Sequence, residues 1–304
     1  MSQLTTDTVE LQDGPTVLRV SPVAGGSITR YASVRDGQTF EWMRPALAAA
    51  VRTRSAGSTS SFPLVPFSNR IRDAAFRFRG RTIQLPANAP PAPHALHGHG
   101  WRQPWAVVSQ VPTGLTLEYR HTADAWPWDY RAEQHFALTD TRLTIRVAVT
   151  NESMEPMPVG FGVHPYYLRT PQVRFRADVD QMWRTDANAM PTELVAAPAG
   201  LPLDAAGLSP DATVLDNNFV GFGGRARVEW PEWNAGLDIV SDPLYSCLVV
   251  YTPEGRDFFC AEPVTNCIDG FNLADQGRTD TGLIILGPGD TAAGDVTFTP
   301  VIGL

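Results

Sequence analysis

Apolar and polar residues alternate with a period of two along several segments of this 304-residue chain. In LTIRVAVTN, which ends at Asn151, the apolar side chains Leu143, Ile145 and Val147 would share one face of an extended strand. This period is typical of a half-buried antiparallel strand. No stretch of ten or more residues carries apolar side chains at the three- and four-residue spacing of a helix. The sequence therefore predicts an all-β fold with few or no helices.

Turn residues divide these segments at regular intervals. AFRFRG followed by RTIQL predicts a hairpin, with Phe76 and Phe78 pointing inward and a turn at Gly80. The 25 glycines and 26 prolines are spread along the chain, as in β-sandwiches. Residues 196–210 read as a long surface loop, and strand patterning continues similarly on both sides of it. We expect a single domain spanning residues 1–304, a large antiparallel β-sandwich. The other strand candidates are GLTLEYRH, GLDIVSD, SCLVVYTP, RDFFCAEP and DVTFTP.

Charge and composition argue against several classes of partner. The formal net charge is −8 and the 24 basic residues form no stripe, so we expect no nucleic-acid partner. The N-terminal stretch lacks a basic segment followed by an apolar one, and no window is long and apolar enough for a membrane span. These features predict a cytoplasmic protein without a membrane partner. Cys247, Cys260 and Cys267 have no paired metal-site spacing and are expected to be buried thiols.

Three histidines, His94, His97 and His99, lie close together in HALHGHGW. On a β scaffold a His-x-His pair with a third imidazole nearby suggests a cupin-like metal site, because alternate residues of a strand face the same way. The segment follows PANAPPAP and contains glycines, so a loop is the expected setting. The alternative is that one histidine is functional and the other two are solvated.

Two adjacent polar residues, Asn69 and Arg70, follow an apolar segment in FPLVPFSNRIRD. An amide that donates and accepts, beside a rigid fork of donors, suits a ligand with many hydroxyls. The simpler reading is a loop that enters a strand, with Arg70 in a surface ion pair.

Three further residues combine polar chemistry with an apolar setting. Glu262 follows an apolar strand in FFCAEPVTN, before a proline expected to end that strand, and Glu is almost never fully buried without a partner. His164 stands in GFGVHPYYL, where it is either a neutral packing residue or a proton carrier. Asp216 in VLDNNFVGF, taken alone, is ordinary turn chemistry.

The aromatic segment AWPWDY, residues 125–130, could stack on a sugar ring, but most of the eight tryptophans are expected in the core. The chain has no Gly-x-Ser-x-Gly nucleophile motif and no glycine-rich phosphate loop before a helix. These absences give no support to serine-nucleophile or nucleotide-binding chemistry.

Taken in order, these motifs resemble the aldose 1-epimerase (galactose mutarotase) family. The matching segments are SNRI with its F-x-F-x-G, LHGHGW, WPWDY, HPYY, the D-x-x-F of DNNF, and AEPVT, running from about residue 60 to 265. The N-terminal GPTVLRVSPVAGGSITRY also fits the opening hairpins of the family. The segment FPLVPFS, which leads to Asn69, and the residue Val163 depart from the family pattern. These departures bear on the identity of the sugar and leave the proton-transferring residues intact.

The resemblance implies a β-sandwich with a sugar cleft and interconversion of the α and β anomers of a free aldose, such as glucose or galactose, without metal or other cofactor. By position, His164 matches the catalytic acid and Glu262 the catalytic base. The matching sugar-contacting positions are Asn69, Arg70, His97, Tyr166 and Asp216.

This chemistry requires two proton carriers. A proton leaves the C1 hydroxyl, another arrives on the ring oxygen, and a carboxylate and an imidazolium suit these steps.

Three other readings remain at this point. A hexose-phosphate 1-epimerase of the same fold would need a site for a dianion, for which Arg72, Arg77, Arg79 and Arg81 are candidates. A non-catalytic carbohydrate-binding protein would need the aromatic residues and Asn69 but no acid and base pair. A cupin-like metal-dependent enzyme is the third.

Overall fold

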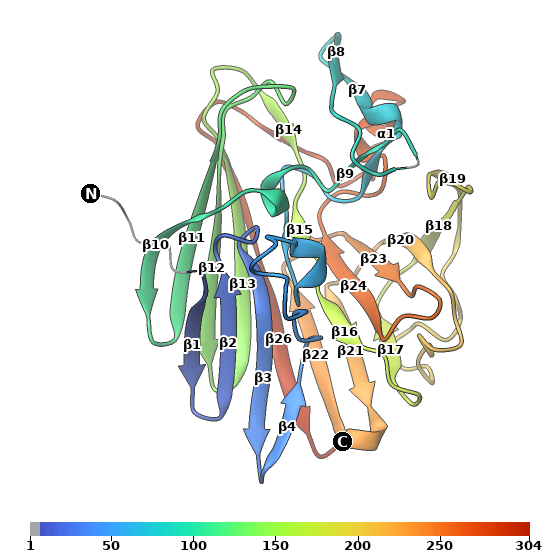
Figure 1. Cartoon of the computed structure of the whole chain (residues 1–304). Helices are drawn as coiled ribbons and strands as arrows, with labels where there is room; N and C mark the ends of the chain where they lie inside the picture. The colour runs from blue at the N-terminus through green and yellow to red at the C-terminus, as the bar shows by residue number, and fades with distance from the viewer. Residues whose placement is uncertain (1–6, 91) are drawn as a thin grey trace.

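The computed structural model describes residues 7–90 and 92–304, and these residues form almost entirely β-strands (Figure 1). Residues 1–6 and Pro91 lie outside the described residues, and so does the start of the N-terminal stretch considered above as a leader. The described part of the chain has one α-helix, α1 (Gly270–Asp275). Its four short 3-10 helices are Ala56–Ser58, Arg72–Ala74, Gly100–Arg102 and Pro231–Trp233. The predicted all-β, antiparallel fold is confirmed.

Two large antiparallel sheets form the body of the molecule, and Figure 1 shows β10–β13 of the first at the left and β18, β20 and β23 of the second at the right. The first sheet contains, in spatial order, β10 (Ala106–Val111), β11 (Gly114–His121), β12 (Tyr130–Thr139), β13 (Arg142–Asn151), β26 (Thr291–Ile302), β22 (Ala235–Ser241), β21 (Arg225–Trp230) and β17 (Arg174–Ala177). The second contains β19 (Pro191–Ala196), β18 (Gln181–Thr185), β20 (Asp216–Val220), β23 (Cys247–Tyr251), β24 (Phe258–Val264), β15 (Gly162–Val163) and β5 (Pro63–Leu64), with β16 (Tyr166–Leu168) paired to β24.

Smaller sheets complete the fold. Four N-terminal strands form a meander, β1 (Val9–Asp13), β2 (Thr16–Ser21), β3 (Ser27–Arg35) and β4 (Gln38–Glu41). The two-stranded sheets are β14 (Met157–Val159) with β25 (Ile284–Leu286), β6 (Arg70–Ile71) with β9 (Ala95–Leu96), and β7 (Ala75–Phe78) with β8 (Arg81–Gln84). The last of these is the predicted hairpin, with Phe76 buried and Phe78 half-buried.

The second sheet places its core residues and its polar residues on opposite faces. Phe259 and Ala261 of β24 belong to the main hydrophobic core, together with Leu248 and Val250 of β23. Their neighbours in sequence point to the other face, because successive side chains of a strand alternate. Glu262 of β24 is therefore turned away from the main core, and this outer face is where the predicted site residues meet.

Two local expectations are wrong. Asp216 does not lie in a turn but begins strand β20, where it pairs with Tyr251. Pro263 does not end β24, which continues to Val264. The N–H of Thr265 bonds to Phe161 on the side of β15, so the nitrogen of Pro263, two residues earlier, faces that same side. On that side the neighbouring chain is interrupted between β15 and β16, so the ladder accommodates a residue with no N–H.

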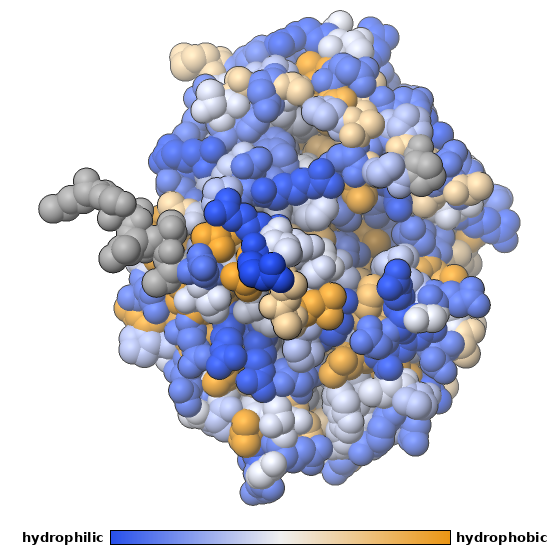
Figure 2. Space-filling view, viewed as in Figure 1, coloured by the Kyte–Doolittle hydropathy of each residue, from blue (hydrophilic) through white to orange (hydrophobic). Residues whose placement is uncertain are grey.

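The surface in Figure 2 carries apolar side chains scattered among polar ones. Among the described residues, no helix has the length and apolar character needed to span a membrane. Cys247, Cys260 and Cys267 are free and buried, as predicted.

Candidate active site

Strand pairing alone brings His164 and Glu262 together. Gly162 of β15 pairs with Val264 of β24, so in this antiparallel register His164 lies opposite Glu262. Val249 of β23 pairs with Glu262 on its other side. A neighbouring row on the same face contains Asp216, Tyr251, Cys260 and Tyr166. The segment before β5 supplies Gly57 and Phe62, and the chain that leads from β5 to the first residue of β6 supplies Asn69 and Arg70. The end of β9 and the segment after it supply Leu96, His97 and Trp101.

All seven predicted site residues line one cavity of about 250 Å³ on this outer face. At about 30 Å³ per liquid water, the cavity has room for about eight waters, which is enough for one small ring. Its lining is Gly57, Phe62, Asn69, Arg70, Leu96, His97, Trp101, His164, Tyr166, Asp216, Val249, Tyr251 and Glu262.

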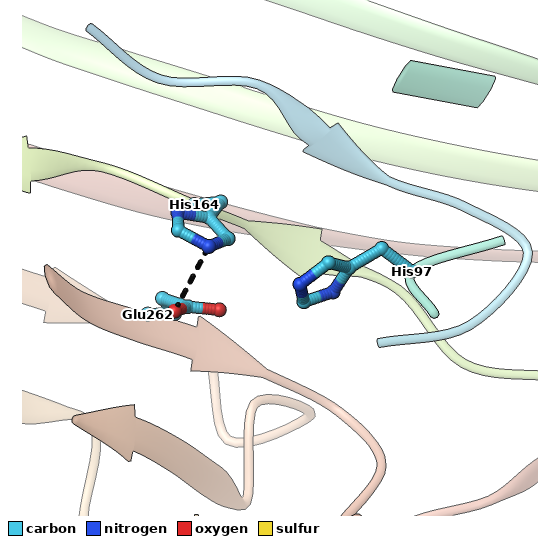
Figure 3. A group of neighbouring side chains, drawn as sticks. All are labelled: His97, His164 and Glu262. Carbon is cyan, nitrogen blue, oxygen red and sulfur yellow. Dashed lines mark ion pairs between the residues drawn. The ribbon is translucent and has the colours of Figure 1, made fainter. Parts of the chain in front are cut away.

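The side chains of His164 and Glu262 are in direct contact, as the dashed line in Figure 3 marks. His164 Nε2 lies 3.2 Å from Glu262 Oε1, and both side chains are buried. Burial, with a smaller contribution from the positive charge of Arg44, lowers the pKa of His164 to about 3. Burial also raises the pKa of Glu262 well above its usual range, and the negative charge of Asp216 adds to this increase. Both groups therefore favour their neutral forms, with one proton held between them.

His97 is fixed by a reciprocal pair of hydrogen bonds with Asn69. The backbone N–H of Asn69 donates to His97 Nδ1 at 3.1 Å, and the backbone N–H of His97 donates to the Asn69 carbonyl at 2.9 Å. Both residues have left-handed backbone conformations, with φ of 58° at Asn69 and 60° at His97. Gly98 follows with φ of 64°, and a Cβ there would lie 2.3 Å from the Val65 carbonyl oxygen. This strained turn holds the imidazole of His97 against the cavity.

Arg70 and Asp216 form an ion pair across the cavity. Arg70 Nη2 donates to Asp216 Oδ2 at 3.3 Å, and Arg70 Nη1 donates to Asn69 Oδ1 at 3.4 Å. The guanidinium is thus oriented from two sides, and the ion pair lies in the predicted site instead of on an unrelated surface. Several donors and acceptors face the cavity together, an arrangement that suits a ligand with many hydroxyls.

The three histidines of HALHGHGW do not converge. His94 is buried, and its Nδ1 accepts from the Asp73 backbone N–H. His99 is half-buried, and its Nε2 is 2.7 Å from the Tyr130 hydroxyl, away from the cavity. The predicted cupin-like cluster is therefore wrong, because a glycine-containing loop turns the three side chains in different directions. The expectation of solvated neighbours is also wrong for His94.

His97, His164 and Glu262 offer donor atoms that all lie within 4.8 Å of one another, which is a spacing that could suit a metal ion (Figure 3). In a neutral imidazole one nitrogen donates and the other accepts. Since Nδ1 of His97 accepts the Asn69 N–H, its Nε2 carries the proton and has no lone pair for a metal. The three side chains therefore provide two ligands instead of three, and His97 is better suited to donate a hydrogen bond to an oxygen.

The motif-based prediction missed three aromatic residues of the cavity, Phe62, Trp101 and Tyr251. Phe62 stacks on His164 with ring centroids 4.4 Å apart, and Trp101 stacks on Phe62 at 5.2 Å. Trp126 and Trp128 of AWPWDY are instead buried in the main core, as expected for most tryptophans. Phe62 stands directly before Pro63, in the segment that leads to Asn69 and Arg70, and this position was a sequence signal for a site residue. Its contact with His164 could not be read from the sequence, because it depends on the pairing of β5 with β15.

Comparison with known proteins agrees with this arrangement. The profile of the family described as Aldose 1-epimerase matches residues 7–299. The chain belongs to the aldose 1-epimerase family. An uncharacterized protein, YphB of Escherichia coli K12, is 32% identical over 262 residues, which is 84% of this chain and 88% of YphB. The expected family resemblance is thus confirmed over nearly the whole chain.

Two solved structures show the family fold. A crystal structure of an Escherichia coli K12 protein, provisionally named an aldose 1-epimerase, is 29% identical with a TM-score of 0.84 and covers 97% of this chain and 99% of that chain. A galactose mutarotase-like protein from Clostridium acetobutylicum is 19% identical with a TM-score of 0.86, covering 97% of this chain and 95% of that chain. The predicted galactose mutarotase-like sandwich is therefore confirmed.

Proposed function

We propose that the protein is a cofactor-independent mutarotase that interconverts the α and β anomers of a free aldose such as glucose or galactose. The contact between His164 and Glu262 in a cavity with room for one small ring carries this proposal. Two proton carriers 3.2 Å apart can reach two oxygens bonded to one carbon, as O1 and O5 are at the anomeric carbon.

In the proposed reaction Glu262 takes the proton of the C1 hydroxyl while the C1–O5 bond breaks. The bonding electrons move to O5, which accepts a proton from His164, and C1 becomes an aldehyde carbon. Rotation about C1–C2 presents the other face, and the same two groups return their protons in reverse. His97 and Arg70 would donate to the sugar oxygens and stabilise the charge that develops on O5.

The proton balance of this reaction matches the state of the buried pair. Before ring opening the pair is carboxylate and imidazolium, and afterwards it is carboxylic acid and neutral imidazole, with one proton in both cases. Burial favours the second form, which is also the form of the empty site. The proton must therefore move from Glu262 to His164 across their contact when the sugar binds, and ring opening returns the pair to its neutral form. The groups can therefore exchange roles without taking protons from solvent.

The direct test follows freshly dissolved α-glucose, α-galactose and a pentose by proton NMR, with and without the protein. We expect faster conversion of the α to the β anomer signal for at least one sugar, with an unchanged equilibrium ratio. Binding without faster exchange would identify a carbohydrate-binding protein instead.

The pH dependence of kcat/KM is expected to differ from that of an ordinary histidine enzyme. The active pair holds one proton, so activity falls at low pH when the pair gains a second proton and at high pH when it loses the first. Because the pKa of His164 is lowered to about 3, the fall of kcat/KM on the acid side should lie below pH 5. The fall on the alkaline side should lie well above the usual pKa range of a glutamate. Initial rates from pH 4.5 to 9 measure this, and an acid-side fall near pH 6.5 would contradict it.

The cavity is poorly suited to a phosphorylated sugar. Arg70 is the only arginine of its lining, and Asp216 already pairs with it. Arg72 pairs with Asp269, and Arg81 pairs with Glu155 on the surface. A dianion would also lie near Asp216 and Glu262. We therefore expect 10 mM inorganic phosphate, a concentration of our choosing, to leave kcat/KM unchanged at constant ionic strength, and competitive inhibition would favour the hexose-phosphate epimerase.

Covered aromatic faces favour catalysis over simple binding. Carbohydrate-binding proteins place sugars on open aromatic faces. Here both faces of Phe62 are occupied, by His164 on one side and Trp101 on the other. The guanidinium of Arg102 lies 4.4 Å from the ring of Trp101. Phe62 and Trp101 therefore offer no free platform for a sugar, and the other aromatic residues of the lining are Tyr166 and Tyr251.

A further inference from the structure

Six planar side chains from four segments form a bent column beside the cavity, in which the rings of Phe62 and Tyr166 also meet each other at 6.2 Å. Its order is Arg44, Tyr166, His164, Phe62, Trp101 and Arg102, with distances between successive groups of 4.2, 4.8, 4.4, 5.2 and 4.4 Å. The three contacts between rings have interplanar angles of 27°, 26° and 22°. His164 is thus the central imidazole of a stack that ends in a guanidinium at each side.

The column holds the His164 ring against two aromatic side chains. Tyr166 and Phe62 each stack on the imidazole, and they also meet each other with ring centroids 6.2 Å apart. Nδ1 of His164 is buried and meets no hydrogen-bonding group of another described residue. The orientation of the ring therefore depends on stacking and on the contact between Nε2 and Glu262. Many histidines that transfer protons are oriented by a hydrogen bond at the second nitrogen, and here the two aromatic faces take that place.

Phe62 is the residue that joins this column to the rest of the site. Its backbone carbonyl accepts the N–H of His164 at 2.9 Å, and its ring also meets His97 edge-on at 6.0 Å. Trp101, which covers its second face, is fixed by a hydrogen bond from Nε1 to the Gly98 carbonyl. Phe62 is buried and so cannot turn away from His164 without displacing these neighbours.

We propose that Phe62 is a positioning residue that keeps Nε2 of the His164 imidazole directed at Glu262, acting through the stacked column. The proposal rests on the proposed mutarotase function for its kinetic part. Phe62 keeps Nε2 directed at the reacting oxygens by preventing the ring from tilting. Its electron-rich face also stabilises the imidazolium form that must donate to O5.

The kinetic test compares Phe62→Leu with Phe62→Tyr. Leucine fills the space without an aromatic face, so we expect kcat to fall by about 10- to 100-fold, with KM changed less than about twofold. Tyrosine retains the face and should restore most of kcat. Phe78→Leu makes the same chemical change on the hairpin β7–β8, outside the cavity, and should leave kcat unchanged. If Phe62→Leu does not fold, as judged by circular dichroism, Phe62→Met serves as the replacement.

A second measurement reports on the stack without any activity. Nitrogen-15 labelled histidine is titrated in the wild type and in Phe62→Leu, with His164 assigned from the loss of its signal in His164→Gln. We expect the ring-nitrogen shifts of His164 to change in Phe62→Leu and to return in Phe62→Tyr. Unchanged His164 shifts in Phe62→Leu would overturn the proposal. A wild type inactive on every aldose, with altered shifts in Phe62→Leu, would overturn only the mutarotase function.

Discussion

Replacing Glu262 by glutamine is expected to lower kcat by at least about 100-fold, the usual contribution of a general base. The amide has the shape of the carboxyl group but cannot accept the proton of the C1 hydroxyl. The measurement is the initial rate of anomer exchange by polarimetry or NMR, at substrate concentrations that separate kcat from KM. Near-normal exchange in this variant would remove Glu262 from the proposed mechanism.

The fold should tolerate this substitution. Glu262 is buried, and its Oε2 has no hydrogen-bond partner among the described residues. Burial already keeps the wild-type carboxyl group neutral, so a neutral amide of the same shape introduces no new charge. We therefore expect a thermal unfolding midpoint close to that of the wild type. Glu193→Gln, in an exposed ion pair on β19, is the matched control and should keep both activity and stability.

The His164→Asn substitution should reduce kcat comparably, by about 10² to 10⁴. Asparagine cannot deliver a proton to the ring oxygen, and its shorter amide does not reach the position of Nε2. It also leaves a gap between Phe62 and Tyr166, so a lower unfolding midpoint is expected as well. The two effects are separated by measuring activity well below the unfolding transition.

His164→Gln supplies a longer side chain that fills more of this gap and still lacks a transferable proton. We expect this variant to regain stability without regaining activity. His135→Asn on β12, where the imidazole contacts Thr116 away from the cavity, is the control for a histidine lost from a strand. Activity in His164→Gln close to that of the wild type would show that His164 acts only by packing.

Much of the fold follows from local pattern. The alternation in residues 143–151 places Leu143, Ile145 and Val147 in the core because β13 has the predicted period. The site residues were found through motif order, and the structure brings all of them to one cavity. Periodicity could not indicate which strands are neighbours, however. The pairing of Asp216 with Tyr251 and of Tyr166 with Cys260 depends on strands far apart in the sequence.

Other features of the site depend on side-chain direction in irregular segments. His94, His97 and His99 share one motif, but only His97 faces the cavity because the backbone is left-handed at His97 and Gly98. The stacking column joins loops before β5 and after β9 to strand β16, so no local spacing could predict it. Pro263 within β24 was misread for a similar reason, because its effect depends on the interruption between β15 and β16.

The position of Glu262 and His164 on one face of adjacent strands makes enzyme activity a reporter of refolding. A slip of β24 by one residue against its neighbours would turn Glu262 toward the core and Ala261 toward the cavity. Such a sheet could retain its circular dichroism spectrum and its compactness. Recovered activity after denaturation would therefore count only the molecules with correctly registered strands, which spectroscopic signals of β structure do not distinguish.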